Sequence, residues 1–233
     1  TGPILQGYPE VLKIPLGLIA AEAAIDVGDI RQASQLLDAL GMGSPTPAQA
    51  TQITYVEGRL LELAGDFEGA VAKWEEVEFS SHRPSRAKAV VARTELLLKL
   101  ERIARAEAIE DYERLRYAWR GDDFEFATLR RLGQLYLEES DYRNGLRTMR
   151  QVVTHFREHK DSQVVAQEMA DAFSRLYLDG AADVLPPVTA IALYDEFKEL
   201  TPSGEKGDEM VRKLADRLVG VDLLDRGAKL LDE

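Results

Sequence analysis

The sequence predicts an all-α protein, a solenoid of about six antiparallel helix pairs. No stretch shows the sustained period-2 alternation with β-branched residues that is typical of strands. Alanine and leucine dominate a composition that is 45% hydrophobic but only 7% aromatic, as is common in helical proteins. One helix-face pattern also returns at a nearly constant spacing, which indicates repeated helix pairs.

The repeated pattern starts from one small residue in the second helix of each pair. These residues are spaced 37 or 38 positions apart, with one interval of 45, and they are Ala33, Ala70, Ala108, Gly145, Ala190 and Ala228. Four positions later come Leu37, Trp74, Tyr112, Met149 and Tyr194. Seven positions later come Leu40, Val77, Leu115, Val152 and Phe197. Positions i, i+4 and i+7 share one helix face, so we expect this face to be buried in each pair. The sixth copy departs from the pattern, because its i+4 position is the acidic Asp232. A frayed or truncated terminal unit would show such a departure.

Proline, glycine and short polar runs predict where the helices begin and end. Residues 1–14 are expected to be an extended lead-in, and Pro15 then fits the first turn of a helix reaching Val27. Ile30, Leu61 and Ala64 are expected to face the core. Breaks are expected at 28–29, 41–45, 65–67, 80–84, near 102, and at 121–123, 140–142, 160–162, 179–187 and 201–204. The later helices are expected at 85–101, 103–119, 188–200, 206–219 and 222–232.

Two units carry a pattern of small, large and aromatic residues around a turn. The stronger unit, 129–157, carries it at Leu132, Gly133, Tyr136, Asp141, Tyr142 and Gly145. The next, 54–81, carries it at Gly58, Gly65, Asp66, Phe67, Ala70 and Trp74. In these residues the chain resembles the tetratricopeptide repeat family. The resemblance covers residues 15–232, closely in two units and loosely in four, and it implies a right-handed α-solenoid.

Some features depart from that family. The period exceeds the family's length of about 34 residues, and the closing proline is mostly absent, Pro202 being the exception. Related helical-hairpin arrays and a conventional bundle remain as alternatives. We expect a single repeat domain over 15–233. The chain begins at Thr1 and ends on an apolar pattern, so we expect a fragment of a longer protein. No targeting segment is visible, which leaves the compartment open between cytoplasm and periplasm.

Composition argues against several classes of function. The chain has 41 acidic and 29 basic residues, a formal charge of −12, which repels phosphate backbones and makes nucleic-acid binding unexpected. It has no cysteine, so disulfides, thiol catalysis and cysteine metal sites are excluded. The most apolar early run, 16–27, is short and carries Glu22 and Asp26, so no membrane insertion is expected.

The sequence favours neither an enzyme nor a metal or cofactor site. His155 and His159 are spaced i, i+4 near Asp161, which suits a metal, but surface histidines on an arginine-rich helix explain them more simply. Adjacent acids on a helix point about 100° apart and do not form an opposed acid/base pair. Such adjacent pairs are Glu75-Glu76, Asp122-Asp123 and Glu138-Glu139.

The resemblance implies that the first helices form a concave wall that binds an extended or helical peptide. The family's inward positions fall here on Tyr55, Arg59, Arg93, Leu97, Arg130 and Gln134. Arg93 and Arg130 share one repeat position, so we expect them to stack along one face and to pair with a carboxylate-bearing partner. The alternative is ordinary ion pairing within the array. The candidate ion-pair partner of Arg59 is Glu62, three residues on along the same helix. Arg93 and Arg130 have no such local acid and would need acids from neighbouring helices.

The leading hypothesis is therefore a non-enzymatic scaffold that binds a protein or peptide partner, possibly an acidic one. The alternative is a self-assembly element that oligomerises through its terminal repeats. Residues 130–160 carry seven basic and four acidic residues, a local surplus that could support head-to-tail association. A third hypothesis, an enzyme or small-molecule binder, would need a deep pocket with convergent polar groups.

Overall fold

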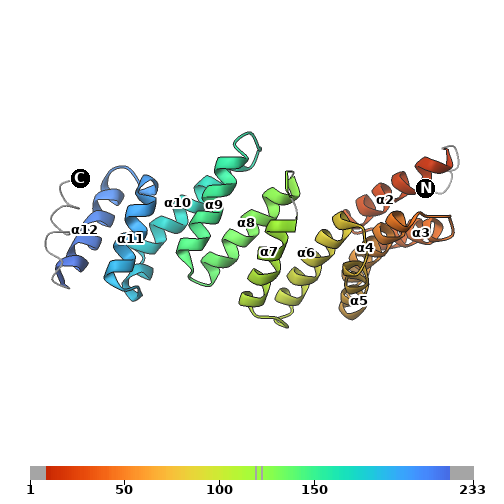
Figure 1. Cartoon of the computed structure of the whole chain (residues 1–233), viewed down its shortest axis with the longest axis horizontal. Helices are drawn as coiled ribbons and strands as arrows, with labels where there is room; N and C mark the ends of the chain where they lie inside the picture. Colours follow the sequence, from red (N-terminus) through yellow and green to blue (C-terminus); the bar gives the residue numbers. More distant parts are fainter. Residues whose placement is uncertain (1–8, 119, 122, 221–233) are drawn as a thin grey trace. The chain divides into compact units, whose positions relative to one another are not determined.

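The computed structural model describes residues 9–118, 120–121 and 123–220, and its regular elements there are all helical (Figure 1). Contacts divide the chain into two compact units, 1–120 and 121–233. Unit 1 contains α2 (Glu10–Asp26), α3 (Ile30–Gly41), α4 (Pro47–Ala64), α5 (Phe67–Glu78), α6 (Arg83–Lys99) and α7 (Arg105–Ala118). Unit 2 contains α8 (Asp123–Glu138), α9 (Tyr142–His155), α10 (Ser162–Leu178), η1 (Ala181–Val184), α11 (Pro187–Phe197), η2 (Lys198–Leu200) and α12 (Glu205–Gly220). The single repeat domain over 15–233 stays a prediction.

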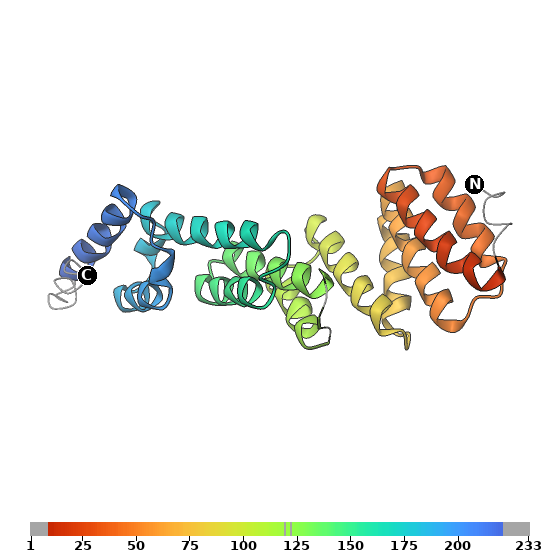
Figure 2. The same ribbon diagram turned by 90° about the horizontal axis from the view of Figure 1, so that it is seen from above.

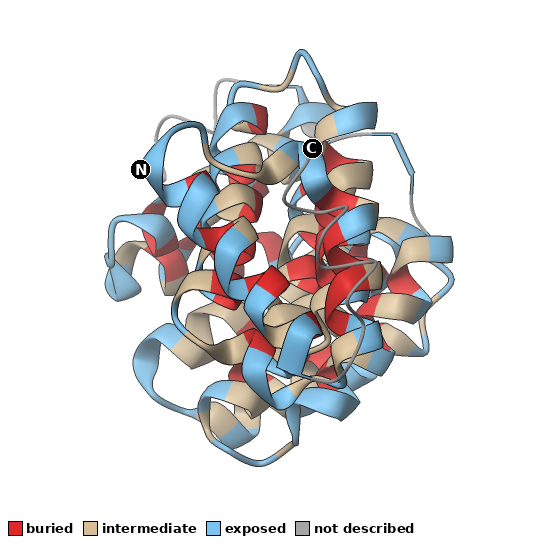
Figure 3. Ribbon diagram, turned by 90° about the vertical axis from the view of Figure 1, so that its left-hand side faces the viewer, coloured by how far each residue is buried: buried red, intermediate tan, exposed pale blue. Residues whose placement is uncertain are grey.

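The repeat pattern is confirmed in the five second helices that lie among the described residues. In α3, α5, α7, α9 and α11, every predicted position of the shared face is buried. These buried stripes, red in Figure 3, lie where the helices of one unit pack together. The sixth copy, with Ala228 and Asp232, and the expected helix 222–232 lie outside the described residues. Ile30 and Ala64 were expected inside but are exposed.

The first helix differs from the prediction. Helix α2 begins at Glu10, so residues 10–14 are not an extended lead-in, and Pro15 lies inside the helix instead of in its first turn. Proline lacks the N–H of one helical hydrogen bond. The helix continues through it because the face bearing Leu18, Ala21 and Ile25 is buried in a shared apolar core with α3 and α4. Most other boundaries agree with the prediction to within two residues.

Three of the second helices begin in the same way. Asp29, Asp66 and Asp141 each accept a hydrogen bond from the backbone N–H three residues on, at 2.9, 2.9 and 3.2 Å. The residue before each aspartate has a positive φ, and it is Gly28, Gly65 or Ser140. This left-handed residue reverses the chain between the two helices of a pair.

Glycines set how closely the helices of a pair approach. In unit 1, a Cβ added at Gly58 of α4 would lie 2.4 Å from Trp74 Nε1 of α5. In unit 2, a Cβ at Gly145 of α9 would lie 3.1 Å from the backbone oxygen of Gly133 on α8. The α4–α5 pair is among the red and orange helices that lie together in Figure 2. Small residues thus allow the close packing that the sequence predicted.

Candidate functional site

The first helices of unit 2 form an open groove of about 590 Å³, which we call the α8–α10 groove. Helix α8 contributes Gln134, Leu137 and Glu138, and α12 contributes Lys206. Most of the remaining lining comes from α10 and the residue that follows it: Glu168, Asp171, Ser174, Arg175, Leu178 and Asp179. The groove is therefore polar, and its acidic side chains outnumber its basic ones.

Two predicted site residues meet at the edge of this groove. Arg130 hydrogen-bonds both carboxylate oxygens of Glu168, one of them through Nε at 3.2 Å. Gln134 Nε2 donates to the same carboxylate at 3.2 Å. The hydrogen bonds that Arg130 donates to Glu168 raise the pKa of the Arg130 guanidinium above its ordinary value. Sequence reasoning named Arg130 and Gln134 but missed Glu168, which lies 38 residues beyond Arg130.

In unit 1, Tyr55 and Arg59 lie on α4. Arg59 is 2.8 Å from Asp26 and 3.9 Å from Glu22, both on α2, so its acids come from a neighbouring helix and not from Glu62. Burial lowers the pKa of Arg59, but the hydrogen bond to Asp26 and the charges of Tyr55, Asp26 and Glu22 together outweigh it, and the pKa is raised overall. Burial also raises the pKa of Tyr55. Tyr55 and Arg59 are thus half-buried and engaged within the unit.

Arg93 and Leu97 lie on α6, where the surroundings differ from those of α8. Arg93 Nε is 2.8 Å from Glu78 at the end of α5, and its Nη2 is 3.6 Å from Asp111 of α7. Leu97 is half-buried. Arg93 therefore forms ion pairs with acids on the second helices α5 and α7. Arg130, at the same repeat position, forms its ion pair with an acid on the first helix α10. Both arginines thus form ion pairs within the array, with acids from neighbouring helices as the alternative interpretation required. Their stacking along one face and their pairing with a partner's carboxylate stay predictions.

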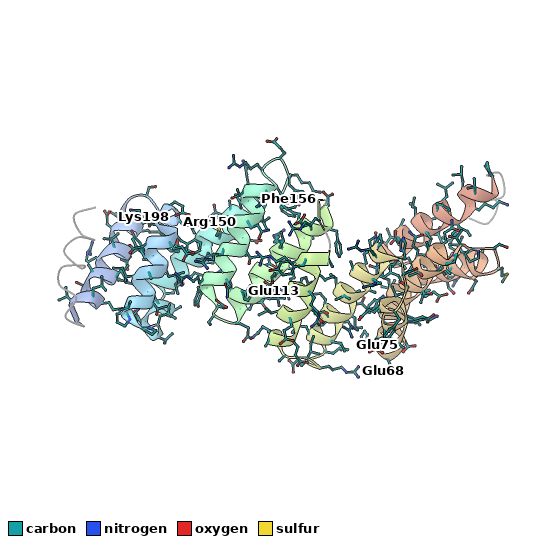
Figure 4. All side chains as sticks on the ribbon, viewed as in Figure 1. Glu68, Glu75, Glu113, Arg150, Phe156 and Lys198 are labelled. Carbon is teal, nitrogen blue, oxygen red and sulfur yellow. The ribbon has the colours of Figure 1, made fainter. Side chains whose placement is uncertain are left out.

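The basic surplus of residues 130–160 is largely engaged in ion pairs inside unit 2. Arg143 and Arg147 of α9 both bind the Glu196 carboxylate of α11. Arg150, labelled in Figure 4, is 2.7 Å from Glu199, and its guanidinium carbon lies 4.2 Å from the centre of the Phe197 ring. These acids are about fifty residues away in sequence, so charge counting within the segment could not find them.

The two histidines on α9 and after it have separate surroundings. His155 Nδ1 lies 2.9 Å from the Gln151 carbonyl oxygen, whereas the His159 ring stacks on Phe126 with centroids 3.7 Å apart. Among the described residues, no group of three or more histidine, aspartate or glutamate side chains is placed to hold a metal ion. None of the described helices is both long enough and apolar enough to cross a bilayer.

The paired, short-looped helices with a recurring buried face define an all-α helical-repeat protein. Its fold is tetratricopeptide-like. It matches the TPR-like repeats of a kinesin light chain from Podosopora anserina with a TM-score of 0.54 and 16% identity, over 83% of this chain and 96% of that one. It also matches the apo quorum sensor NprR from B. thuringiensis with a TM-score of 0.52 and 14% identity, over 99% of this chain and 66% of that one. No protein-family model and no curated sequence matches the chain.

Proposed function

We propose that the chain is a non-enzymatic interaction module that binds a segment of a partner protein in the α8–α10 groove. The observation that carries this proposal is the convergence of Arg130 and Gln134 on Glu168 at the edge of an open groove. Two of the residues expected to bind a partner thus lie where a cavity of about 590 Å³ provides room for peptide side chains.

The charges of the groove favour a particular kind of segment. Its lining includes Glu138, Glu168, Asp171 and Asp179, against Arg175 and Lys206. Arg130 neutralises Glu168, and Arg131 lies 2.9 Å from Glu138. Asp171 and Asp179 are then matched in number by Arg175 and Lys206, so the groove offers carboxylates to lysine or arginine side chains and cations to acidic ones. In this groove we therefore infer a segment that carries both basic and acidic side chains, whereas the sequence led us to expect an acidic one.

The test is a selection of peptides from a random library on the whole chain, followed by affinity measurement by fluorescence anisotropy. We expect the selected peptides to carry both basic and acidic side chains and to lose at least tenfold in affinity on the double variant Gln134→Ala/Asp171→Lys. The control variant Gln163→Ala changes an exposed α10 residue that is not among the groove lining, and it should bind normally. Selection of no peptide, or equal affinity for all three proteins, would exclude the groove as the binding site.

Self-association is the second candidate, and exposed apolar residues on the first helix pair support it. Val27 and Met42 are 79% and 86% exposed, and Val11 and Ile19 are also exposed. A second copy could cover this face through apolar contact. Light scattering behind a sizing column should then give a mass that rises with concentration, and Ile19→Glu should abolish the rise. A constant monomer mass would contradict this candidate.

A further inference from the structure

Unit 1 contains a second cavity, of about 270 Å³, between α6 and α7 beside the end of α5. Its lining is rich in arginine, and we call it the arginine pocket: Glu78, Arg83, Arg86, Ala87, Val90, Arg93, Asp111, Arg114, Leu115 and Ala118. Four arginines thus face two acids, in a chain whose overall charge is −12. Basic side chains thus outnumber acidic ones in this lining, whereas acidic side chains outnumber basic ones in the lining of the α8–α10 groove.

Both acids of the pocket are already engaged. Asp111 accepts a hydrogen bond from the buried Thr94 hydroxyl at 2.6 Å and pairs with Arg114. Arg93 lies between the two acids, 2.8 Å from Glu78 and 3.6 Å from Asp111. The acids therefore neutralise Arg93 and Arg114 and leave the other two arginines of the pocket without a counter-charge.

Those two arginines are Arg83 and Arg86, both exposed on the first turn of α6. Neither forms an ion pair within the part of the chain that the structure describes, and Arg83 donates only to the Ala118 carbonyl oxygen at 3.4 Å. The first turn of α6 carries no acidic residue. Because a helix N-terminus is itself positive, cations there are unfavourable for the helix. Helix stability does not explain these arginines, but a bound anion would make them favourable.

Two exposed aromatic side chains adjoin the pocket in sequence. Phe79 follows the lining residue Glu78 and is 91% exposed, and Tyr117 precedes the lining residue Ala118 and is 72% exposed. They are the only aromatics among the strongly exposed apolar side chains of the described residues. Arginine and aromatic residues are the types most enriched at binding hot spots. Next to the charged pocket, these two sequence neighbours of its lining residues therefore provide apolar surface.

We propose that the arginine pocket binds an acidic segment of a partner protein. A carboxylate of that segment binds Arg83 and Arg86, and an adjacent apolar side chain packs against Phe79 and Tyr117. The charge of −12 disfavours a nucleic acid, whose phosphates extend far beyond a small pocket, whereas one or two carboxylates fit inside it. The pocket lies in unit 1, so this site is independent of the α8–α10 groove.

The experiment measures binding of a fluorescein-labelled peptide in which a phenylalanine is flanked by glutamates. We expect the whole chain to bind it with an affinity that falls as salt rises, and Arg83→Ala/Arg86→Ala to lower that affinity at least tenfold. The matched control is Arg31→Ala/Arg212→Ala, which removes two exposed arginines elsewhere and should change the affinity less than threefold. Circular dichroism should show unchanged helix content, because all four arginines are exposed.

Three results would overturn the proposal. The first is an equal loss of affinity in the pocket and control variants. The second is equal binding of a reference peptide with glutamine in place of glutamate. The third is that a phosphoserine version of the peptide, or a single-stranded RNA oligonucleotide, binds while the glutamate peptide does not. Loss of binding in Phe79→Ser, with circular dichroism unchanged, would support the apolar half of the site. Peptide selection on the α8–α10 groove variants is unaffected by any of these outcomes.

Discussion

Helix pairs α4–α5 and α6–α7 of unit 1 use the same repeat positions in opposite ways. In α4, Gly58 makes room for Trp74, which is fully buried and whose indole Nε1 donates to the Tyr55 carbonyl oxygen at 3.2 Å. In α6, the equivalent position is Leu96, a buried side chain in the apolar cluster that contains Trp74 and Val77 of α5. At this repeat position a glycine admits a large ring from the second helix of its own pair, whereas a leucine fills space in the cluster of the preceding second helix.

The two seams also differ in what lies between their helices. The α4–α5 seam is packed by apolar side chains around Trp74, and the ion pair between Lys73 and Glu57 there, at 2.6 Å, is partly exposed. The α6–α7 seam instead carries polar bridges, from Thr94 to Asp111 at 2.6 Å and from the Tyr112 hydroxyl to Glu95 at 2.7 Å. The arginine pocket lies on this second seam. The two seams of unit 1 thus differ in their side chains, and the arginine pocket lies on the one with the Thr94–Asp111 bridge.

The largest effect is expected where the close approach depends on glycine. Gly58→Ala would place a Cβ 2.4 Å from Trp74 Nε1 and 2.8 Å from Cδ1, in a rigid and fully buried ring. We expect it to lower the free energy of unfolding by about 1–3 kcal/mol. The measurement is urea unfolding followed by circular dichroism.

Two further glycine variants sharpen this test. Gly133→Ala meets Met149 Cγ at 2.8 Å, but a flexible methionine can move, so its cost should be under about 1 kcal/mol. Gly41→Ala meets nothing within 4 Å and should leave stability unchanged or raise it slightly, because alanine favours a helix. If Gly58→Ala unfolds at the same urea concentration as Gly41→Ala, close packing against Trp74 does not limit the α4–α5 pair.

The polar seam gives the next effect. Thr94→Val removes the buried hydroxyl that donates to Asp111 and leaves that carboxylate short of a partner, at an expected cost of about 1–2 kcal/mol. Thr128→Val is the control, because the buried Thr128 hydroxyl has no hydrogen-bond partner among the described residues. It should be neutral or stabilising. Equal costs for the two variants in urea unfolding would contradict a structural role for the Thr94–Asp111 bridge.

The helical fold and its repeat could be predicted because they depend on short-range periodicity. The buried face through Ala70, Trp74 and Val77 follows from the 3.6-residue turn alone. The start of α2 could not be placed, because burial of its apolar face outweighs the missing N–H of Pro15, and that burial depends on α3 and α4. Local signals predict a helix, but its first residue depends on what packs against it.

The surroundings of the candidate site depend on contacts that the repeat position does not specify. Arg93 and Arg130 are equivalent in sequence, yet one binds Glu78 and the other Glu168. Each acid lies on another helix, at a sequence distance that only packing determines. The arginine pocket gave no local signal, because the expected helix began at residue 85, whereas α6 begins at Arg83 and so places Arg83 and Arg86 in a first turn without an acid.

One partly buried carboxyl in each unit, Glu196 and Glu78, should respond to pH in opposite directions. Burial alone would raise the pKa of Glu196, but hydrogen bonds from Arg147 and Arg143 outweigh it and lower the pKa below its ordinary 4.5. Its stabilisation is therefore fully present above pH 4.5 and is lost as pH falls through the lowered pKa. We expect Glu196→Gln to cost about 1 kcal/mol near neutral pH, and the difference from wild type to vanish in acid.

Glu78 of unit 1 is the counterpart. Burial raises the pKa of Glu78, and Arg93 only partly opposes this. The folded chain therefore binds a proton on Glu78 more readily than the unfolded chain does. Its contribution to stability grows as pH falls through the raised pKa, the reverse of Glu196. Urea unfolding of Glu78→Gln and Glu196→Gln across pH should therefore give differences from wild type with opposite slopes. Parallel slopes would mean that Arg143 and Arg147 of α9 do not lower the pKa of Glu196.

The smallest effect concerns the turns of the α4–α5 and α8–α9 pairs. Both turns need a residue with positive φ before the capping aspartate, and they use Gly65 at 85° and Ser140 at 61°. A side chain makes this conformation costly, so Ser140→Gly should stabilise unit 2 by about 0.5–1 kcal/mol, while Gly65→Ser destabilises unit 1 to a similar extent. Ser44→Gly, at an exposed loop position without positive φ, should instead be neutral or destabilising, because glycine adds freedom to the unfolded chain. If Ser140→Gly shifts the thermal midpoint downward together with Ser44→Gly, the left-handed turn carries no strain, and the two pairs differ only in how their helices pack.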